Sequence, residues 1–274
     1  MIGALVAAAL AAASPAAGTL APMGPVHHSN ADPAIFVVRD ADTTVYIFGT
    51  FHALDANTQW FDDRVKDAFE KSDELVLETL VPEDPRPGHR IALSAAPLRL
   101  SMATSASFLA TTRMAINAGK SQGMQVDNGA DMVLRRAAED EGKPVEGLET
   151  LESQLNMFLK MPPTRAAPLP RPGEPVEQTG SMVSLSKSMA ELQSAWKRGD
   201  QSIFVRMLDQ LERSSPDTYR MMFAERNARW ADWIRARMQT PGTVFVAVGA
   251  GHLAGKDSVL VQLAERGIYS TRVN

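Results

Sequence analysis

The chain has 274 residues, of which 45% are hydrophobic, and a formal net charge of −4 with a sequence pI near 5.8. This length allows one compact α/β domain, or a domain with a helical insertion, to bury a substantial core. Because no Lys/Arg block or basic surplus is present, we expect no nucleic-acid partner. The absence of cysteine excludes disulfides, thiolate metal sites and cysteine nucleophiles.

The first 18 residues are apolar, alanine-rich and uncharged, and they run into small residues. This pattern predicts a signal peptide over residues 1–18, without the usual basic n-region, and therefore a periplasmic or secreted protein. The alternative is a disordered alanine-rich tail. Residues 19–33 are expected to form a flexible segment. No later apolar stretch approaches 18 residues, so we expect no membrane span in the mature chain.

A hairpin and a crossover unit are predicted next. Residues 34–39 and 43–48 favour two strands joined by a tight turn. A helix over residues 61–71 and a strand over 74–78 follow. Strand, helix and strand in this order are typical of a parallel crossover.

The middle of the chain is less regular. Residues 81–123 predict helix with loops, and residues 128–142 predict a helix with Asn128 as its N-cap. A strand over 144–149 then leads into a helix that Thr150 caps. Residues 162–175 hold six prolines, which predicts a surface connection.

The C-terminal part predicts three helices, a buried strand, a further helix and a last strand. Their residues are 181–197, 201–213, 216–238, 243–248, 258–266 and 268–273.

Two Gly-x-x-His tetrapeptides, Gly49–His52 and Gly249–His252, each follow directly after a predicted buried strand. Each histidine therefore stands at the carboxyl end of a strand, which is the edge where ligands bind in open α/β sheets. The two histidines are 200 residues apart in sequence but could meet in one cleft.

Together with a carboxylate, the two histidines would form a metal site with an open position. Glu78 ends the strand after the first motif and would reach the same edge, and Glu149 is a second carboxylate candidate. Such ligands suit zinc, manganese, iron or cobalt, and a metal-bound water can ionise near neutral pH.

Structural explanations compete with these roles. Either histidine could simply be a hydrogen-bonded core residue, and Glu78 and Glu149 could cap helices. Arg226 and Arg229 could lie on a solvated helix face, with Glu225 pairing to Arg229. From the residues alone, a metal site and an acid/base site both stay open beside these structural explanations.

Six separated blocks of sequence carry a resemblance to a known family that covers roughly residues 34–273. The chain resembles the TraB/GumN family, which is related to the Tiki metalloproteases and, more remotely, to erythromycin esterases and haem-binding ChaN proteins. The blocks are residues 46–52, the strand ending at Glu78, residues 142–150 with Gln154-Leu155, Ala195-Trp196 with Gly199-Asp200, residues 225–230 and residues 248–253.

The resemblance implies an α/β (α+β) fold, in which helices flank a mixed central β-sheet and a helical insertion is present, as one domain over residues 34–274. It also implies divalent-metal-dependent cleavage of peptide bonds. Carried over residue by residue, His52, Glu78 and His252 match metal ligands. Glu78, Arg226 and Glu149 match catalytic positions. The implied cofactor is a divalent ion of the Mn, Co or Zn class.

Two other functions stay open at this point. One is a non-catalytic protein that binds or sequesters a peptide or haem-like ligand. The other is a metal-independent ester hydrolase in which His52 is the general base. The sequence leaves the peptide or small-molecule substrate, the metal and the oligomeric state undetermined.

Overall fold

The computed structural model describes residues 29–80, 117–161 and 178–273. The predicted signal peptide, the proline-rich connection at 162–175 and most of the predicted 81–123 region lie outside the described residues. In the part that is described, no helix is long and apolar enough to cross a membrane.

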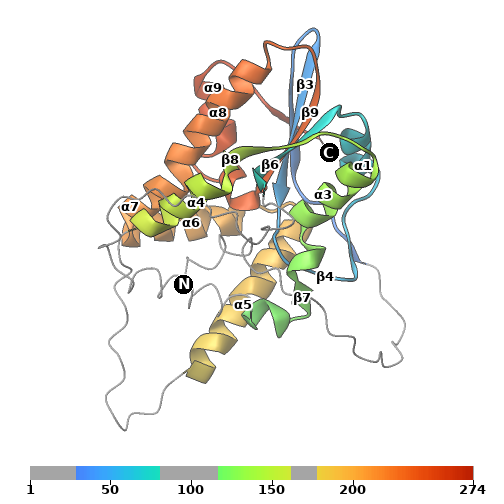
Figure 1. Cartoon of the computed structure of the whole chain (residues 1–274). Coiled ribbons are helices and arrows are strands. Elements are labelled where there is room, and N and C mark those ends of the chain that lie inside the picture. The colour runs from blue at the N-terminus through green and yellow to red at the C-terminus, as the bar shows by residue number, and fades with distance from the viewer. Residues whose placement is uncertain (1–28, 81–116, 162–177, 274) are drawn as a thin grey trace, which may run out of the picture.

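A mixed six-stranded sheet forms the centre of the described structure (Figure 1), in the order β10-β2-β3-β9-β6-β8. β3, β9, β6 and β8 are parallel to one another, whereas β2 pairs antiparallel with both of its neighbours, β3 and the edge strand β10. The bounds are β2 Ile35–Arg39, β3 Thr43–Thr50, β6 Glu74–Leu80, β8 Val145–Thr150, β9 Gly242–Gly249 and β10 Thr271–Arg272.

The predicted hairpin and crossover are both confirmed. β2 pairs antiparallel with β3, and α1 (Asp63–Glu70) connects β3 to the parallel strand β6. The two strands of the crossover are not neighbours, because β9 lies between them and pairs with both. The α/β class with a mixed central sheet is therefore observed.

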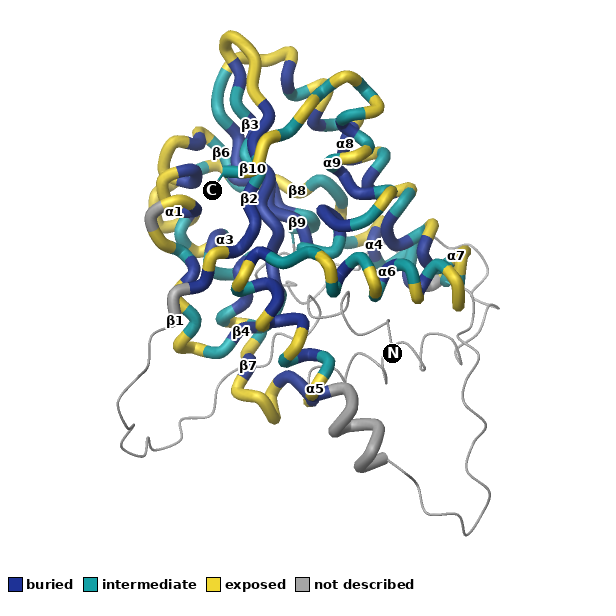
Figure 2. Tube along the Cα trace, turned by 180° about the vertical axis from the view of Figure 1, so that it is seen from behind, coloured by how far each residue is buried: buried dark blue, intermediate teal, exposed yellow. Residues whose placement is uncertain are grey.

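The alternation of side chains along the strands divides the core into two layers. In β9, Phe245 and Ala247 pack toward α1 and α3 (Ala130–Asp140). The valines at 244, 246 and 248 pack toward α8 (Glu225–Arg237) and α9 (Val259–Glu265) on the other face. Both faces of the sheet are covered, so its central strands are buried (Figure 2).

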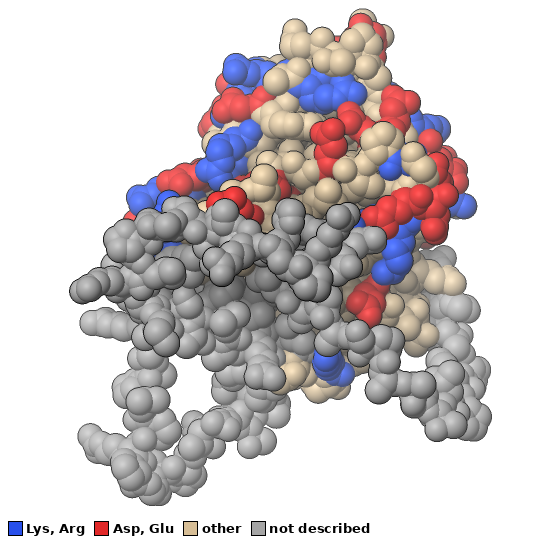
Figure 3. Space-filling view, viewed as in Figure 1, with Lys and Arg blue, Asp and Glu red and all other residues tan. Residues whose placement is uncertain are grey.

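The other α-helices of the described residues are α4 Leu151–Lys160, α5 Gln178–Lys197, α6 Ser202–Ser214 and α7 Pro216–Tyr219, and short 3₁₀ helices span Val126–Asn128 and Ala250–Leu253. Short strands β1 (Ser29–Asn30) with β5 (Thr58–Gln59), and β4 (Leu54–Asp55) with β7 (Met124–Gln125), add two small ladders. On the face in Figure 3, acidic and basic side chains are interspersed over the described part, as the lack of a basic block predicted.

The start of α3 differs from the prediction. The N-cap of α3 is Gly129 rather than Asn128, because the chain turns tightly there: Ala130 N donates to Phe51 O, and a Cβ on Gly129 would collide with His52 O. The Asn128 side chain instead donates to Leu54 O.

The predicted helix over 216–238 is interrupted by a π-helical turn at Arg220–Ala224, between α7 and α8. The predicted last strand over 268–273 is reduced to β10, because the backbone N–H groups of residues 266–268 close the end of α9. There, Gly267 N donates to Ala264 O and Ile268 N to Leu263 O, with Gly267 at φ +78°. This is the Schellman pattern of helix ends.

Candidate functional site

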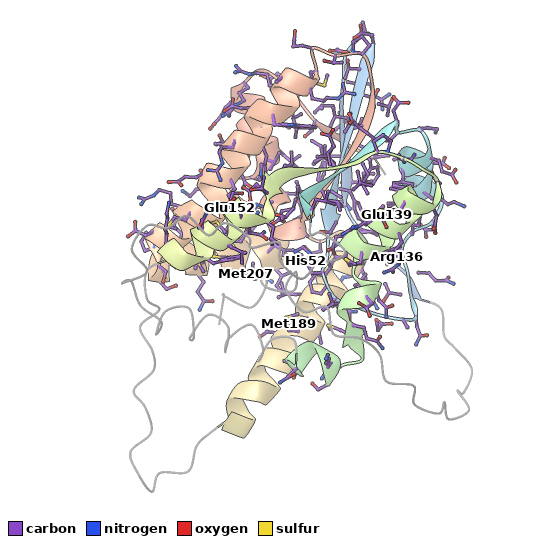
Figure 4. All side chains as sticks on the ribbon, in the orientation of Figure 1. His52, Arg136, Glu139, Glu152, Met189 and Met207 are labelled. Carbon is purple, nitrogen blue, oxygen red and sulfur yellow. The ribbon has the colours of Figure 1, made fainter. Side chains whose placement is uncertain are left out.

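The two Gly-x-x-His motifs lie side by side because β3 and β9 are parallel neighbours in register. Thr50 pairs with Gly249, so both strands end at the same edge of the sheet. β6 is the next strand beyond β9, and it carries Glu78 to this edge. In Figure 4, His52 lies between α3 and α4 below the ends of the strands.

Gly249 stands at the centre of the site. A Cβ placed on this glycine would lie 3.4 Å from His52 Nε2, 3.5 Å from Glu78 Oε2 and 3.6 Å from His252 Cδ2. The three predicted metal ligands therefore surround one backbone position. Its missing side chain leaves the space between them.

His52 is held by a carboxylate that the sequence did not reveal. Its Nδ1 lies 3.2 Å from Oδ1 of Asp131, in the first turn of α3, and its side chain is 25% exposed. Burial lowers the pKa of His52, but the negative charges of Asp131 and Glu78 outweigh burial and raise it to about 9. Asp131 could have been noticed only as an acidic residue at the start of a predicted helix.

His252 is held in one tautomer by Asn227. The side-chain amide of Asn227 donates to Asp257 O at 2.7 Å, so its Oδ1 faces His252 Nδ1 at 2.6 Å. Nδ1 therefore carries the proton, and Nε2 keeps its lone pair. The ring contacts Phe223 and Trp230, with centroids 4.8 and 4.5 Å away. Burial, helped by the charge of Arg226, lowers the pKa of His252 to about 3 against the opposing charge of Glu78.

Arg226 is completely buried, so the alternative that it lies on a solvated helix face is wrong. Its Nε donates to both carboxylate oxygens of Glu149, at 3.1 and 3.0 Å, and its Nη2 donates to Glu78 Oε1 at 2.6 Å. Its Nη1 donates to Met222 O and lies 3.3 Å from His252 Nε2. One guanidinium thus joins both predicted carboxylates and one predicted imidazole.

The competing explanations for the remaining charges hold only in part, because Arg229 is exposed on its helix, as that explanation expected. Exposed Arg229 contacts Glu149 at 3.2 Å, and Glu225 pairs with Arg220, so the expected Glu225–Arg229 pair is not observed. Thr150, as predicted, caps α4 by accepting from Ser153 N. Glu149 therefore does not cap this helix.

Glu78 receives hydrogen bonds on both oxygens. Oε1 accepts from Arg226 and from Gln154 Nε2 at 3.3 Å, and Oε2 accepts from Gly249 N at 3.2 Å. Burial raises the pKa of Glu78, but the charge of Arg226, followed by those of His252 and His52, holds it well below its usual range. Glu78 is therefore ionised at neutral pH.

The chemistry of the donors suits a divalent ion. Each imidazole has its Nδ1 against an oxygen, of Asp131 or Asn227, and this is how proteins orient histidine ligands whose Nε2 binds a metal. Two ligand atoms of one zinc ion lie about 3.4 Å apart. His252 Nε2 and Glu78 Oε2 are 3.9 Å apart.

The spacing, however, is not that of a closed metal site. Within the ranges that the structure describes, no three His, Cys, Asp or Glu side chains are grouped so that they could hold an ion. Binding would require His252 Nε2 and Glu78 Oε2 to approach each other by about half an ångström and Arg226 Nη1 to leave His252 Nε2. The donor types fit a metal ion, whereas their separations require this rearrangement.

Part of the chain is similar in sequence to curated bacterial proteins. The chain is 28% identical over 138 residues to the uncharacterized protein YbaP of Escherichia coli strain K12, covering 50% of this chain and 48% of the relative. YbaP of Shigella flexneri matches with the same identity and coverage. The chain thus matches about half the length of these curated relatives. No solved structure matches it.

A family model covers far more of the chain than these relatives do. The model of the TraB/PrgY/gumN family matches residues 34–104 and 89–272, which include both Gly-x-x-His motifs, Glu78, Glu149 and Arg226. The chain belongs to the TraB/PrgY/gumN family.

Proposed function

We propose that this protein is a hydrolase that cleaves peptide bonds with a divalent metal ion held by His52, Glu78 and His252. The observation that carries the proposal is the convergence of these three side chains around Gly249. The bound ion would supply a water that ionises near neutral pH and would polarise a carbonyl oxygen.

The chain's own residues divide the remaining work. Asp131 and Asn227 orient the imidazoles. Glu78 is better suited to be a ligand than a proton acceptor, because its low pKa is far from the neutral range in which a general base works best. Arg226 keeps Glu78 ionised, binds Glu149 as well, and places a fixed positive charge beside the position where the substrate carbonyl would react.

The protonation of His52 couples metal binding to pH. With a pKa near 9, the free side chain is an imidazolium at pH 7, whereas a ligand must be neutral. A metal ion that binds His52 would therefore displace a proton. Metal affinity is expected to rise between pH 6 and pH 9.

A second candidate function uses the same histidine without a metal. The contact between His52 and Asp131 also suits a general base oriented by a carboxylate, which would activate water for hydrolysis of an ester. With the pKa of His52 near 9, the rate of such a reaction would rise up to about pH 9 and would be insensitive to chelators.

Elemental analysis and turnover together test the proposal. Purified wild type, His52→Ala and His252→Ala are compared, with His89→Ala as a control outside the motifs. We expect close to one equivalent of a divalent ion in wild type and control, none in the two site variants, and cleavage of a mixture of fluorogenic peptides that a chelator abolishes. Cleavage that survives in both site variants would refute the proposal.

Other outcomes separate the alternatives. Hydrolysis of an ester that survives chelation favours the metal-independent reaction. Stoichiometric binding of a peptide or haem without turnover at any metal concentration favours a binding protein.

We also propose that the chain is exported, on the basis of residues 1–18. The N-terminal sequence of the protein recovered from a periplasmic or culture fraction tests this. An intact Met1 in the cytoplasmic fraction alone would contradict it.

A further inference from the structure

Gln154 is a buried polar side chain at the edge of the site. α4 starts directly after β8, so its first turns lie close to the carboxyl edge of the sheet. Gln154 is 3% exposed, and its Nε2 donates to Glu78 Oε1 at 3.3 Å. It therefore contacts a predicted metal ligand.

The contact with Glu78 fixes which way the amide of Gln154 points. An ionised carboxylate only accepts hydrogen bonds, so the NH₂ group must face it. The reverse orientation would place two oxygen acceptors against each other. The carbonyl oxygen of Gln154 is therefore directed away from Glu78.

That carbonyl oxygen is buried and lacks a hydrogen-bond donor among the residues that the structure describes. Two neighbouring donors are already used, since Arg226 Nη2 and Gly249 N both donate to Glu78. A buried acceptor without a donor is uncommon and unfavourable, so a bound molecule that brings a donor would gain from this position.

We infer that Gln154 determines specificity by accepting a hydrogen bond from a backbone N–H of a bound peptide. The inference rests on the proposed peptide-bond hydrolysis and names a feature of its substrate. A peptide group carries an N–H donor, whereas an ester group at the same place has only acceptors. Gln154 would therefore make the site favour peptide backbones over ester backbones.

Esters introduced one at a time into a peptide test this inference. A peptide that the full-length protein cleaves, or binds if it cleaves none, is first selected from the fluorogenic mixture. Analogues then replace one backbone N–H by oxygen at each position except the scissile bond. For wild type, we expect kcat/KM to fall on the order of 10-fold at one position.

Two variants assign the loss to Gln154. In Gln154→Met, which has similar volume but no carbonyl oxygen, the penalty at that position should disappear. Gln193→Met is the matched control, because Gln193 is also buried but donates to Asp55 away from the site. It should keep the penalty. Thermal unfolding of each variant shows whether it is folded.

Binding measurements separate this inference from the proposed function. The same analogues are titrated into His52→Ala, with and without Gln154→Met. Cleavage with equal ester penalties in wild type and Gln154→Met overturns the inference and leaves the hydrolase standing. No cleavage, but a penalty in Kd that depends on Gln154, supports the inference and rejects the hydrolase. Neither cleavage nor binding of any peptide rejects both.

Discussion

The two Gly-x-x-His motifs end neighbouring parallel strands, yet their histidines meet opposite surroundings. His52 is one-quarter exposed and paired with the carboxylate of Asp131, which raises its pKa to about 9. His252 is buried between two aromatic rings beside the guanidinium of Arg226, and its pKa falls to about 3. One motif thus places a cationic imidazole at the site and the other a neutral one.

The glycines that open the two motifs differ in the same way. A Cβ on Gly49 would lie 3.1–3.3 Å from Ala250 and Leu253, and Gly49 O accepts from the indole of Trp196. Gly49 is therefore required for packing. Gly249 faces the site itself. The first glycine of the shared motif thus packs in the core in one copy and faces the site in the other.

The largest effect on stability is expected at Arg226, whose guanidinium joins Glu78 and Glu149 to the second motif. Arg226→Met leaves Glu78 and Glu149 buried without their shared cation, and it should lower the free energy of unfolding by about 3–5 kcal/mol. Urea denaturation at pH 7 measures this loss. Arg229→Ala, which removes only an exposed partner of Glu149, should lower it by less than about 1 kcal/mol. Equal effects of the two variants would contradict the difference in burial.

The two histidines should give stability opposite dependences on pH. His52 binds its proton more tightly in the folded chain, so its contribution, at most about 3 kcal/mol, is present below pH 6.5 and is lost as the pH rises through 9. His252 binds its proton less tightly when folded. Stability should therefore also fall as the pH drops below 6.5, and Glu78, which likewise binds its proton less tightly in the folded chain, adds to this fall below pH 4.5.

Single variants separate the loss of stability above pH 6.5 from the loss below it. Asp131→Asn should flatten the curve between pH 6.5 and 9, and His252→Gln should flatten it between pH 4.5 and 6.5. Chemical denaturation across this range provides the measurement. A curve that Asp131→Asn leaves unchanged would show that this carboxylate does not control His52.

The smallest effects should separate the two glycines. Gly49→Ala brings a methyl group against Ala250 and Leu253 and should cost about 1–3 kcal/mol of stability. Gly249→Ala meets its neighbours at ordinary contact distances, so it should change stability by less than about 1 kcal/mol while filling the space between the histidines and Glu78. Elemental analysis measures the metal content of both variants, and unfolding curves measure their stability. Full metal content in a folded Gly249→Ala would argue against a site at this position.

The sequence predicted the strands that form the site but not the contacts between them. Runs such as 43–48 and 243–248 are apolar on both faces, which is typical of buried parallel strands, and a glycine marks the end of each. The meeting of His52, Glu78 and His252 follows from these strand ends. The position of β9 between β3 and β6 does not, because pairing between distant strands leaves no local signal.

The charged partners were missed for a related reason. Local spacing suggests that Arg229 pairs with Glu225, whereas its partner Glu149 comes from a strand 80 residues away. Asp131 and Asn227 lie in helices and carry no local pattern that points to a histidine. They contact His52 and His252 across 79 and 25 residues of sequence. The π-helical turn before α8 also lies in a segment whose pattern is that of a continuous α-helix.

Because β9 lies in the middle of the sheet but late in the sequence, the sheet cannot be completed until the end of synthesis. During synthesis, β3 and β6 emerge well before the strand that must pair with both, so the centre of the sheet stays incomplete until the last part of the chain appears. Contacts this distant in sequence slow folding, because a long loop must close before they form. A nascent chain that stalls before residue 242 would therefore expose two unpaired strand edges and have no site.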